Sequence, residues 1–312
     1  MTEQSSKSLS KTGWVSIGVL SLVFFGAYFV LRALPAAQCG FLHYEEIVNA
    51  EGEIELCATN HAGFIDLTRF TYPIVTELSS DTALEPGVTA QVELNLQTQG
   101  GTNIAPHELA VTHTEKMHVM VIDPSLEDYH HVHPRADGLN GRYQFDFKPT
   151  HGGAYRVFTE IVPLRSRSQA IALSELAVAG ESQRPKFERS TVSVVDGVRF
   201  ELLGAPESLQ RGRDYRFEVK VAGAEGAVVH LETIMGAKGH MVAFDAAGKG
   251  FAHMHPVDSV ASARTAGFGG GMEEVAELAF LFNVPNTGWY RLFAQIQVEG
   301  KPVFGRFDLK VE

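Results

Sequence analysis

One histidine pattern occurs twice in this chain of 312 residues, and the repeat is the strongest constraint on its fold. Residues 118–134 and 240–256 both follow the pattern H-x12-H-x-H-P, with each matched position shifted by 122 residues. A chain of this length typically forms about two domains, so the repeat predicts two copies of one structural unit. The matched histidines are His118, His131 and His133 in the first copy and His240, His253 and His255 in the second.

Each copy of the pattern predicts a β-hairpin. Apolar runs flank turn-forming Asp, Pro, Ser and Gly residues between the histidines. With the first turn centred after residue 125, we expect His118 opposite His133. The same register places Met120 opposite His131, whereas Val242 occupies the place of Met120 in the second copy. Opposed residues lie about 5 Å apart and alternate residues share a face, so three imidazoles should gather on one side of each hairpin.

Three imidazoles at this spacing indicate a transition-metal site. We predict copper, as Cu(I) or Cu(II), with zinc as the other candidate ion; a thioether from Met120 would favour soft Cu(I). A single HxH motif is more typical of a surface turn with hydrogen-bonded histidines. Its repetition in two diverged copies favours metal binding. The predicted ligands are Met120, His118, His131, His133, His240, His253 and His255.

Several residues close to the motif are candidates for further ligands. His113 and Met235 lie five residues before the first histidine of their copies. Strand parity places both on the opposite face unless the backbone bends there. The same parity points His130 and Met254 away from the site. The matched turn residues Asp123 and Asp245, like Met117 on its strand, are expected to be structural.

The repeat continues beyond the histidines with a different offset. Residues 145–161 correspond to residues 280–296, a shift of 135, so thirteen residues are inserted in the glycine-rich segment of the second copy. We interpret the insertion as a surface loop, with a lid that carries Met272 as the alternative. Tyr155 and Tyr290 match each other and predict core packing with a tyrosine-corner hydrogen bond.

The N-terminal part of the chain predicts a membrane anchor. Residues 14–34 are apolar except for Arg32, which is long enough to cross a bilayer and longer than the core of a typical signal peptide. Lysines before the span and glutamates after it place the N-terminus in the cytoplasm and the rest of the chain in the periplasm, at the inner membrane. The net charge of −11 gives no basic footprint for nucleic acid.

Two cysteines, Cys39 and Cys57, flank a predicted hairpin directly after the apolar span. In an oxidising compartment such a pair predicts a disulfide. A Cys2His2 ion site is the alternative, because His43 and His61 each follow a cysteine by four residues.

Short strands separated by turn residues begin near residue 70, and no 3.6-residue period is present. This pattern predicts an all-β protein with two tandem Ig-like, or cupredoxin-like, β-sandwiches after one transmembrane helix. A polar stretch that ends at residue 189 is the predicted linker. The expected segments are a cytoplasmic tail at 1–13, the anchor at 14–34, a cysteine-containing hairpin at 35–66 and sandwich domains at 67–189 and 190–312.

The motif also resembles a group of bacterial secreted or membrane-anchored domains. These YtkA-like or Ig-like β-sandwiches carry MH…HxHP motifs and are associated with the handling of heavy metals, copper among them. The resemblance covers residues 70 to 312, and the second copy departs from it with Gly239 where the first has Met117. The residues that carry it are Met117, His118, Asp123, Ser125, Leu126, Tyr129, His131, His133 and Pro134, then Phe145, Phe147, Pro149, Gly153, Tyr155, Arg156 and Phe158.

We therefore expect a membrane-anchored, non-enzymatic protein that buffers copper or delivers it to a membrane partner. Exposed histidines exchange ions readily, which favours delivery. A hydrolytic zinc or oxidative copper enzyme is a weaker alternative, because the predicted site face carries no Asp or Glu in both copies. The remaining alternative is a structural accessory subunit that docks on an integral-membrane complex through its β-sandwiches.

Overall fold

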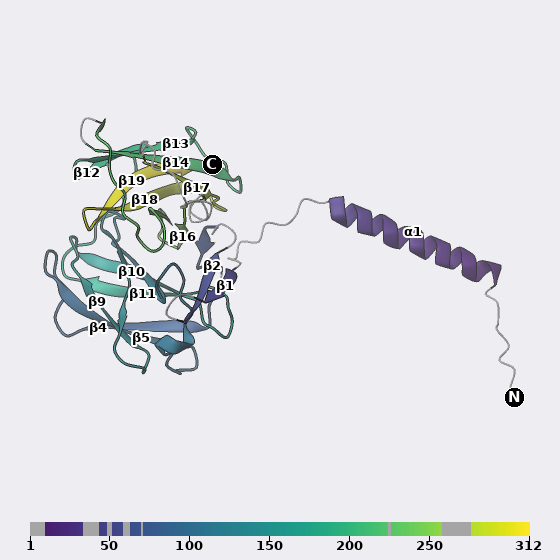
Figure 1. Cartoon of the computed structure of the whole chain (residues 1–312), viewed down its shortest axis with the longest axis horizontal. Coiled ribbons are helices and arrows are strands. Elements are labelled where there is room, and N and C mark those ends of the chain that lie inside the picture. Colours follow the sequence, from purple (N-terminus) through teal and green to yellow (C-terminus); the bar gives the residue numbers. More distant parts are fainter. Residues whose placement is uncertain are drawn as a thin grey trace. The chain divides into compact units, whose positions relative to one another are not determined.

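The computed structural model describes residues 10–33, 44–48, 52–58, 63–69, 71–223, 226–257 and 276–312. It is mostly β-structure with one N-terminal helix, and it divides into an N-terminal unit, Met1–Cys39, and a second unit, Gly40–Glu312 (Figure 1). The glycine-rich segment with Met272 lies outside the described residues, as do Cys39, His43, His61 and the side chain of Cys57.

The N-terminal unit contains helix α1, Lys11–Ala33. Ser10 precedes the helix and its hydroxyl accepts a hydrogen bond from the Gly13 N–H at 3.2 Å, which satisfies one of the free donors of the first turn. Lys11–Arg32 has a mean hydropathy of 2.1, and its side chains are not buried. A helix of this length extends about 34 Å, enough for a bilayer core. A signal sequence would share these properties.

The predicted hairpin after the helix is confirmed by strands β1, Tyr44–Val48, and β2, Ile54–Ala58, which pair antiparallel. The backbone of β2 also pairs with the first sandwich, because Leu56 N–H donates to the Val111 carbonyl at 2.8 Å. Leu56 is buried there with Ala110 and Val162. The segment between the helix and the sandwiches is therefore anchored to the folded body.

The first repeat forms two four-stranded sheets around a shared core (Figure 1). One sheet has the order β4-β5-β9-β8: Ile74–Ser80, Ala90–Thr98, Arg142–Phe147 and Arg135–Ala136. The other has the order β11-β10-β6-β7: Ala170–Val178, Gly153–Ile161, Met117–Ile122 and Tyr129–Val132. A 3-10 turn, η1, spans Pro106–Glu108. In β5 the alternating residues Val92, Leu94 and Leu96 are fully buried, as expected for a strand with one face on the core.

The second repeat has the same arrangement with a second core. One sheet has the order β12-β13-β14-β17: Val192–Val195, Val198–Leu203, Tyr215–Ala222 and Ala276–Phe282. The other has the order β19-β18-β15-β16-β3: Lys301–Val311, Gly288–Val298, His240–Asp245, Gly250–Met254 and Ile65–Asp66.

Strand β3 precedes the first sandwich in the sequence, yet it completes a sheet of the second. It pairs with β16 at Gly250, where a Cβ atom would clash with the carbonyl oxygen of Ile65. Only glycine allows the two backbones to approach so closely. The N-terminal segment thus contributes to both repeats, which the sequence pattern did not indicate.

The histidine hairpins belong to the sheets through which the two repeats pack against each other. Every residue of β6 is buried: Met117, Val119 and Val121 point into the first sandwich core, while Met120 and Ile122 lie in a cluster between the repeats. The second repeat follows the same rule. Its β15 strand places Met241 and Ala243 in the second core, and Val242 and Phe244 in the same inter-repeat cluster. Burial on both faces explains why these strands read as continuous apolar runs.

The contacts between the repeats are reciprocal. Arg156 of the first repeat donates to the Ala247 carbonyl of the second. The matched Arg291 of the second repeat donates to the Ser125 carbonyl of the first at 3.2 Å. Such paired contacts are typical of an isologous interface, in which the same patch is used by both partners. The predicted linker lies against this interface, where Phe187 stacks on Trp289 at 5.7 Å.

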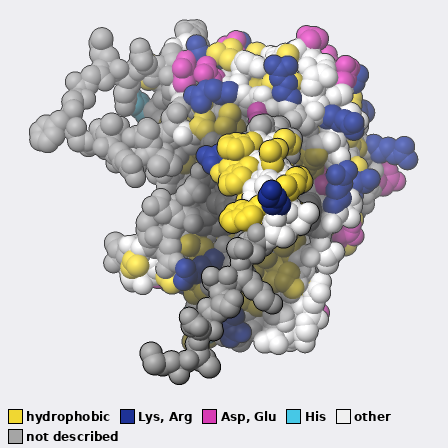
Figure 2. Space-filling model, turned by 90° about the vertical axis from the view of Figure 1, so that its right-hand side faces the viewer, with side chains coloured by type: hydrophobic (Ala, Val, Ile, Leu, Met, Phe, Trp, Pro, Cys, Tyr) yellow, Lys and Arg dark blue, Asp and Glu magenta, His cyan; other side chains and the backbone are white. Residues whose placement is uncertain are grey.

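Charges on the surface are mixed. Figure 2 shows one face of the molecule, on which Lys and Arg side chains are interspersed with Asp and Glu side chains. Exposed ion pairs such as Lys220–Glu277, at 3.1 Å, contribute little to stability because water screens them. Interspersed charges are typical of a solvated surface.

The predicted hydrogen bonds of the two matched tyrosines are confirmed. Because their partners differ, we expect replacing each tyrosine to reduce stability by a different amount. Tyr290 donates only to the Asn286 carbonyl, whereas Tyr155 donates to buried Asp128 at 2.6 Å and accepts from the His151 N–H. Tyr155→Phe leaves a buried carboxylate with one partner fewer, so we expect a loss of about 1–3 kcal/mol. Tyr290→Phe should cost about 0.5–1.5 kcal/mol. Urea unfolding of both variants measures the difference, and equal losses would contradict it.

Candidate metal centre

The predicted hairpin register is confirmed in both repeats. Met120 pairs with His131 across β6 and β7. Val242 pairs with His253 across β15 and β16. Because the first histidine lies at the start of one strand and the HxH motif at the end of the other, this register places the three rings of each copy on the same face.

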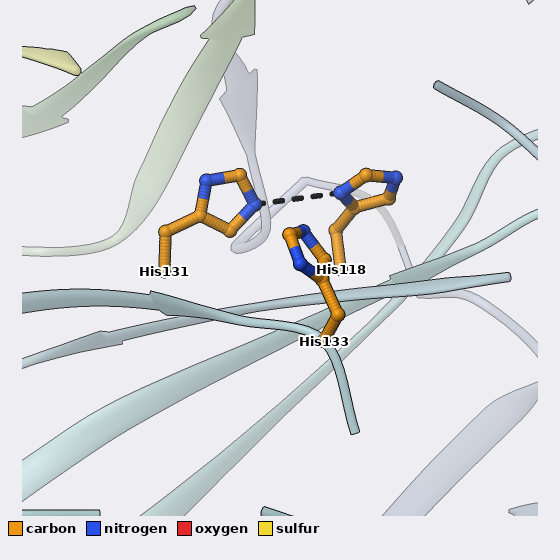
Figure 3. Close-up of side chains that lie close together, drawn as sticks. All are labelled: His118, His131 and His133. Carbon is orange, nitrogen blue, oxygen red and sulfur yellow. Dashed lines mark hydrogen bonds between the residues drawn. The ribbon is translucent and has the colours of Figure 1, made fainter. Parts of the chain in front are cut away.

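The first triad consists of His118, His131 and His133, whose ring nitrogens converge (Figure 3). One ligand atom from each residue lies within 4.8 Å of the others. His118 Nδ1 and His131 Nε2 are 3.4 Å apart, and the ring centroids of His131 and His133 are 4.9 Å apart. His118 is 1 % exposed, whereas His131 and His133 are half-buried.

The second triad consists of His240, His253 and His255, and it has the same geometry. Its ligand atoms also lie within 4.8 Å of one another. The ring centroid of His255 is 4.6 Å from that of His240 and 4.7 Å from that of His253. His240 and His253 are buried. The structure thus brings all six predicted histidines together in two groups that suit a metal ion.

The two triads are in contact. The ring of His253 lies 5.5 Å from that of His118 and 5.2 Å from that of His131, centroid to centroid. Rings within a triad are separated by similar distances, such as the 5.7 Å between His240 and His253. The interface between the repeats therefore encloses one cluster of histidines, which the sequence alone did not predict.

A seventh histidine, His113, joins the cluster because the backbone bends before the strand, the exception that the parity argument allowed. His113 stacks on His255 at 3.5 Å and 16°, although strand parity pointed it away. The cause is a tight turn: His113 and Thr114 both have positive φ, 53° and 68°, and Thr112 and Glu115 close the turn with backbone hydrogen bonds. Two successive positive φ angles define a type I′ turn, which reverses the direction of the chain.

The second repeat contains the equivalent turn. Met235 and Gly236 have positive φ, 50° and 74°, and Ile234 and Ala237 close the turn with backbone hydrogen bonds. A Cβ atom at Gly236 would lie 3.8 Å from a methyl carbon of Thr114, so the two turns contact each other across the interface. Met235 is 8 % exposed. Its role as a ligand stays a prediction.

The first histidine of each triad is held by a backbone carbonyl on the side away from the triad. His118 Nε2 is 2.9 Å from the Thr112 carbonyl, and His240 Nε2 is 3.0 Å from the equivalent Ile234 carbonyl. A carbonyl oxygen only accepts, so each of these nitrogens carries the proton. The Nδ1 atom of both rings then carries a lone pair that faces the triad, and in His118 it lies 3.4 Å from His131 Nε2. Such outer hydrogen bonds are typical of metal-ligating histidines.

The central histidine of each triad is held by the opposite repeat. His131 Nδ1 lies 3.0 Å from the Gln295 side-chain oxygen. His253 Nδ1 lies 3.2 Å from a carboxylate oxygen of Glu160, whose other oxygen accepts from Gln169 at 2.6 Å. Glu160 and Gln295 occupy equivalent positions, 135 residues apart. Because only one of the two is acidic, the sequence shows no carboxylate shared by both copies.

Within the described part of the chain, three inward nitrogens are buried without a hydrogen-bond partner: His133 Nε2, His240 Nδ1 and His253 Nε2. A buried polar atom without a partner costs about 1–3 kcal/mol. Each of these atoms belongs to a triad, and a metal ion would satisfy it. The donor set therefore fits an ion that prefers imidazole, such as copper or zinc.

Burial lowers the pKa of five of the six triad histidines. Burial and the charge of His253 lower the pKa of His118 to about 4, and burial with neighbouring histidines lowers the pKa of His133 to about 3. Burial is also the largest cause that lowers the pKa of His131, His240 and His255 well below the usual value. Neutral imidazole is the form that binds metals, so the rings need not release a proton when an ion binds near neutral pH.

Glu160 is the one buried carboxylate that contacts the triads in the described residues. Burial raises its pKa, but the hydrogen bond and charge of His253, together with His118 and Gln169, lower it to about 2. The cluster thus contains a buried, ionised carboxylate beside its imidazole rings. This charge partly offsets that of a bound cation.

The other predictions for single residues have mixed outcomes. His130 points away and pairs with Asp128 at 3.0 Å, and Met117 and Met254 lie in the sandwich cores, as predicted. Asp123 and Asp245 accept backbone hydrogen bonds within their turns, which confirms a structural role. Met120 is fully buried in the inter-repeat cluster, and its predicted role as a ligand stays a prediction.

A family model matches residues 74–173 and 193–312, which together make up more than half of the chain. The chain belongs to the family described as a domain of unknown function, DUF8832. The two matched stretches of this DUF8832 chain coincide with the two repeats, and the family description names no metal. The resemblance to YtkA-like domains stays a prediction. None of the curated proteins matches the chain.

Solved structures give only distant similarities. Salmonella alpha-2-macroglobulin reacted with methylamine is 13% identical, with a TM-score of 0.25 over 81% of this chain and 15% of that one. Trypsin-activated alpha-2-macroglobulin from Escherichia coli is 14% identical, with a TM-score of 0.24 over 84% of this chain and 17% of that one. The DUF8832 chain thus spans less than a fifth of these proteins. A CARDB domain from Pyrococcus furiosus in complex with di-metal ions is 19% identical, with a TM-score of 0.19 over 35% of this chain and 91% of that one.

Proposed function

We propose that this protein binds copper through its two histidine triads and holds the ions between its repeats. The observation that supports this function is the orientation of the rings. In each triad two of the three rings have a nitrogen held by a protein acceptor. Inward nitrogens such as His240 Nδ1 and His253 Nε2 have no hydrogen-bond partner in the described residues. Rings positioned in this way are preorganised for an ion.

Copper is proposed over zinc because of the ligand types. Each triad offers imidazole nitrogens, which suit both ions, but the buried thioether of Met120 is paired with His131 and favours Cu(I). The coordination shell of zinc in proteins is usually completed by a further hard ligand or water. Zinc remains the competing ion in the test below.

Burial of the triads supports retention more than rapid delivery. The expectation of delivery assumed exposed histidines, whereas His118, His240 and His253 are between 0 and 3 % exposed and the other three triad histidines are half-buried. An ion in this position leaves only when the surrounding side chains or the two repeats move apart. We therefore propose a buffering or resident copper site, with release to a membrane partner as a slow step.

We also propose where in the cell the protein binds copper. Helix α1 is long and apolar enough to act as an uncleaved anchor in the inner membrane, with the repeats in the periplasm. We also infer that both repeats are Ig-like or cupredoxin-like sandwiches, since each has two packed antiparallel sheets. We propose a binding role without catalysis.

The experiment is a metal titration of the full chain in detergent. We expect about two equivalents of Cu(I) to bind in competition with a chromogenic chelator, and the double variant His118→Ala, His240→Ala to lose most of this binding. His107→Ala, at an exposed position outside the triads, is the matched control. Circular dichroism checks that each variant is folded.

Two outcomes would contradict the proposal. Binding of neither copper nor zinc beyond that of the double variant would remove the metal site itself. Stoichiometric zinc binding that copper does not displace would leave a metal site but overturn the choice of copper.

A further inference from the structure

We propose that the two triads hold their ions as one dinuclear centre, built across the interface between the repeats, in which a small anion binds between the ions when both are divalent. This inference rests on the proposed metal-binding function and deepens it. Two separate sites, one in each repeat, are the simpler expectation from the sequence. Three features of the histidine cluster favour a shared centre.

The first feature is distance. The closest rings of different triads, those of His131 and His253, have centroids 5.2 Å apart. A copper or zinc ion lies about 2 Å from its ligating nitrogen and hence about 3 Å from the ring centroid. Even with both ions on the far sides of these rings, they would be less than about 12 Å apart. Two ions this close share one local environment.

The second feature is that neither repeat completes its own site. The outward nitrogen of His131 is held by Gln295 of the second repeat, and that of His253 by Glu160 of the first. His113 of the first repeat also stacks on His255 of the second triad. Each triad is thus oriented by residues of the other repeat, so the two sites form together when the repeats pack.

The third feature is charge. An imidazole that ligates a metal ion is neutral, and Glu160 is the buried carboxylate beside the triads in the described residues. Two Cu(I) ions would leave this buried centre with a small excess of positive charge, which is tolerable. Two divalent ions would leave a large excess, and an uncompensated charge is strongly unfavourable in a buried site. The divalent pair therefore requires a small anion, such as hydroxide or azide.

The coordination number of the metal ions also favours a bound anion. Three histidines leave at least one position open on an ion that prefers four ligands. One anion shared by two ions fills an open position on each and lowers the net charge of the centre. This arrangement needs the two triads to face a common space, as the close contacts of His253 with both His118 and His131 indicate.

The test uses the full-length protein loaded with two equivalents of copper and then oxidised. Electron paramagnetic resonance should give a coupled pair, seen as a half-field transition or as a signal well below two spins per protein. Azide should then produce one new charge-transfer absorption that saturates at one azide per copper pair. The variant His240→Ala, with one triad incomplete, should give the signal of an isolated ion and provides the reference spectrum.

Each other result overturns the inference in a recognisable way. Two bound ions with a full signal of two isolated spins would exclude a shared centre and leave the proposed copper binding intact. Loss of copper on oxidation, or saturation at two azides or none, would exclude the anion-bridged form. Failure to bind copper at all would instead remove the proposed function.

Discussion

Replacing Arg291 with methionine is expected to destabilise the folded repeats by about 3–5 kcal/mol, the usual cost of breaking a buried ion pair by removing one partner. Arg291 is 1 % exposed, and its guanidinium donates to both oxygens of buried Asp308 at 2.7 Å. It also donates to the linker at the Lys186 carbonyl and to the first repeat at the Ser125 carbonyl. Without the guanidinium, the buried carboxylate of Asp308 has no positive partner. The bonds that join the second repeat to the linker and to the first repeat are lost as well.

Chemical unfolding of the full chain measures this effect, and the matched position provides the control. Arg156 is the equivalent arginine of the first repeat, but it is partly exposed and donates to the Ala247 carbonyl across the interface. Arg156→Met should therefore cost much less, about 1 kcal/mol. The double variant Arg291→Met, Asp308→Leu should recover part of the loss, because it leaves no unpaired charge. Equal effects of Arg291→Met and Arg156→Met would contradict the assignment.

Replacing Glu160 with alanine is expected to weaken copper binding by the second triad about 10- to 100-fold. The carboxylate accepts from His253 Nδ1 and so fixes both the orientation of the ring and the nitrogen that faces the triad. Without it, His253 can rotate or change its tautomer, and part of the cluster's negative charge is lost. The first triad should be affected less, because His131 is held by Gln295.

The sequence suggests a control for this prediction. Glu160→Gln places at this position the residue that the second repeat already uses, and its side-chain oxygen can still accept from His253. The Glu160→Gln variant should bind copper more tightly than Glu160→Ala, because glutamine still orients the His253 ring. Stepwise copper affinities from chelator competition measure both variants. An alanine variant that binds copper as tightly as the unmodified protein would show that Glu160 does not position the ring.

Much of the site was predictable because it depends on local rules. The alternation of side chains along a strand and the length of the turn fix which residues oppose each other, so the pairing of Met120 with His131 followed from spacing. The repeat then indicated a second site. Parity does not apply at His113, because two residues with positive φ reverse the chain before the strand begins. A His-Thr pair is not a typical type I′ turn sequence, so the sequence gives little signal for it.

The sequence by itself determined the elements: an apolar helix, two runs of short strands, and two hairpins that each gather three histidines. Only the tertiary structure decided that the hairpins face each other, that β3 crosses to the second repeat and that Glu160 and Gln295 complete the triads of opposite repeats. The physical reason is how far apart along the sequence the contacting residues lie. Strand pairing within a hairpin is set by neighbours in the sequence, whereas the packing of two apolar sheet faces joins residues more than ninety positions apart, such as Glu160 and His253. Repeats that share a pattern can pack in many ways, and the pattern alone does not select one.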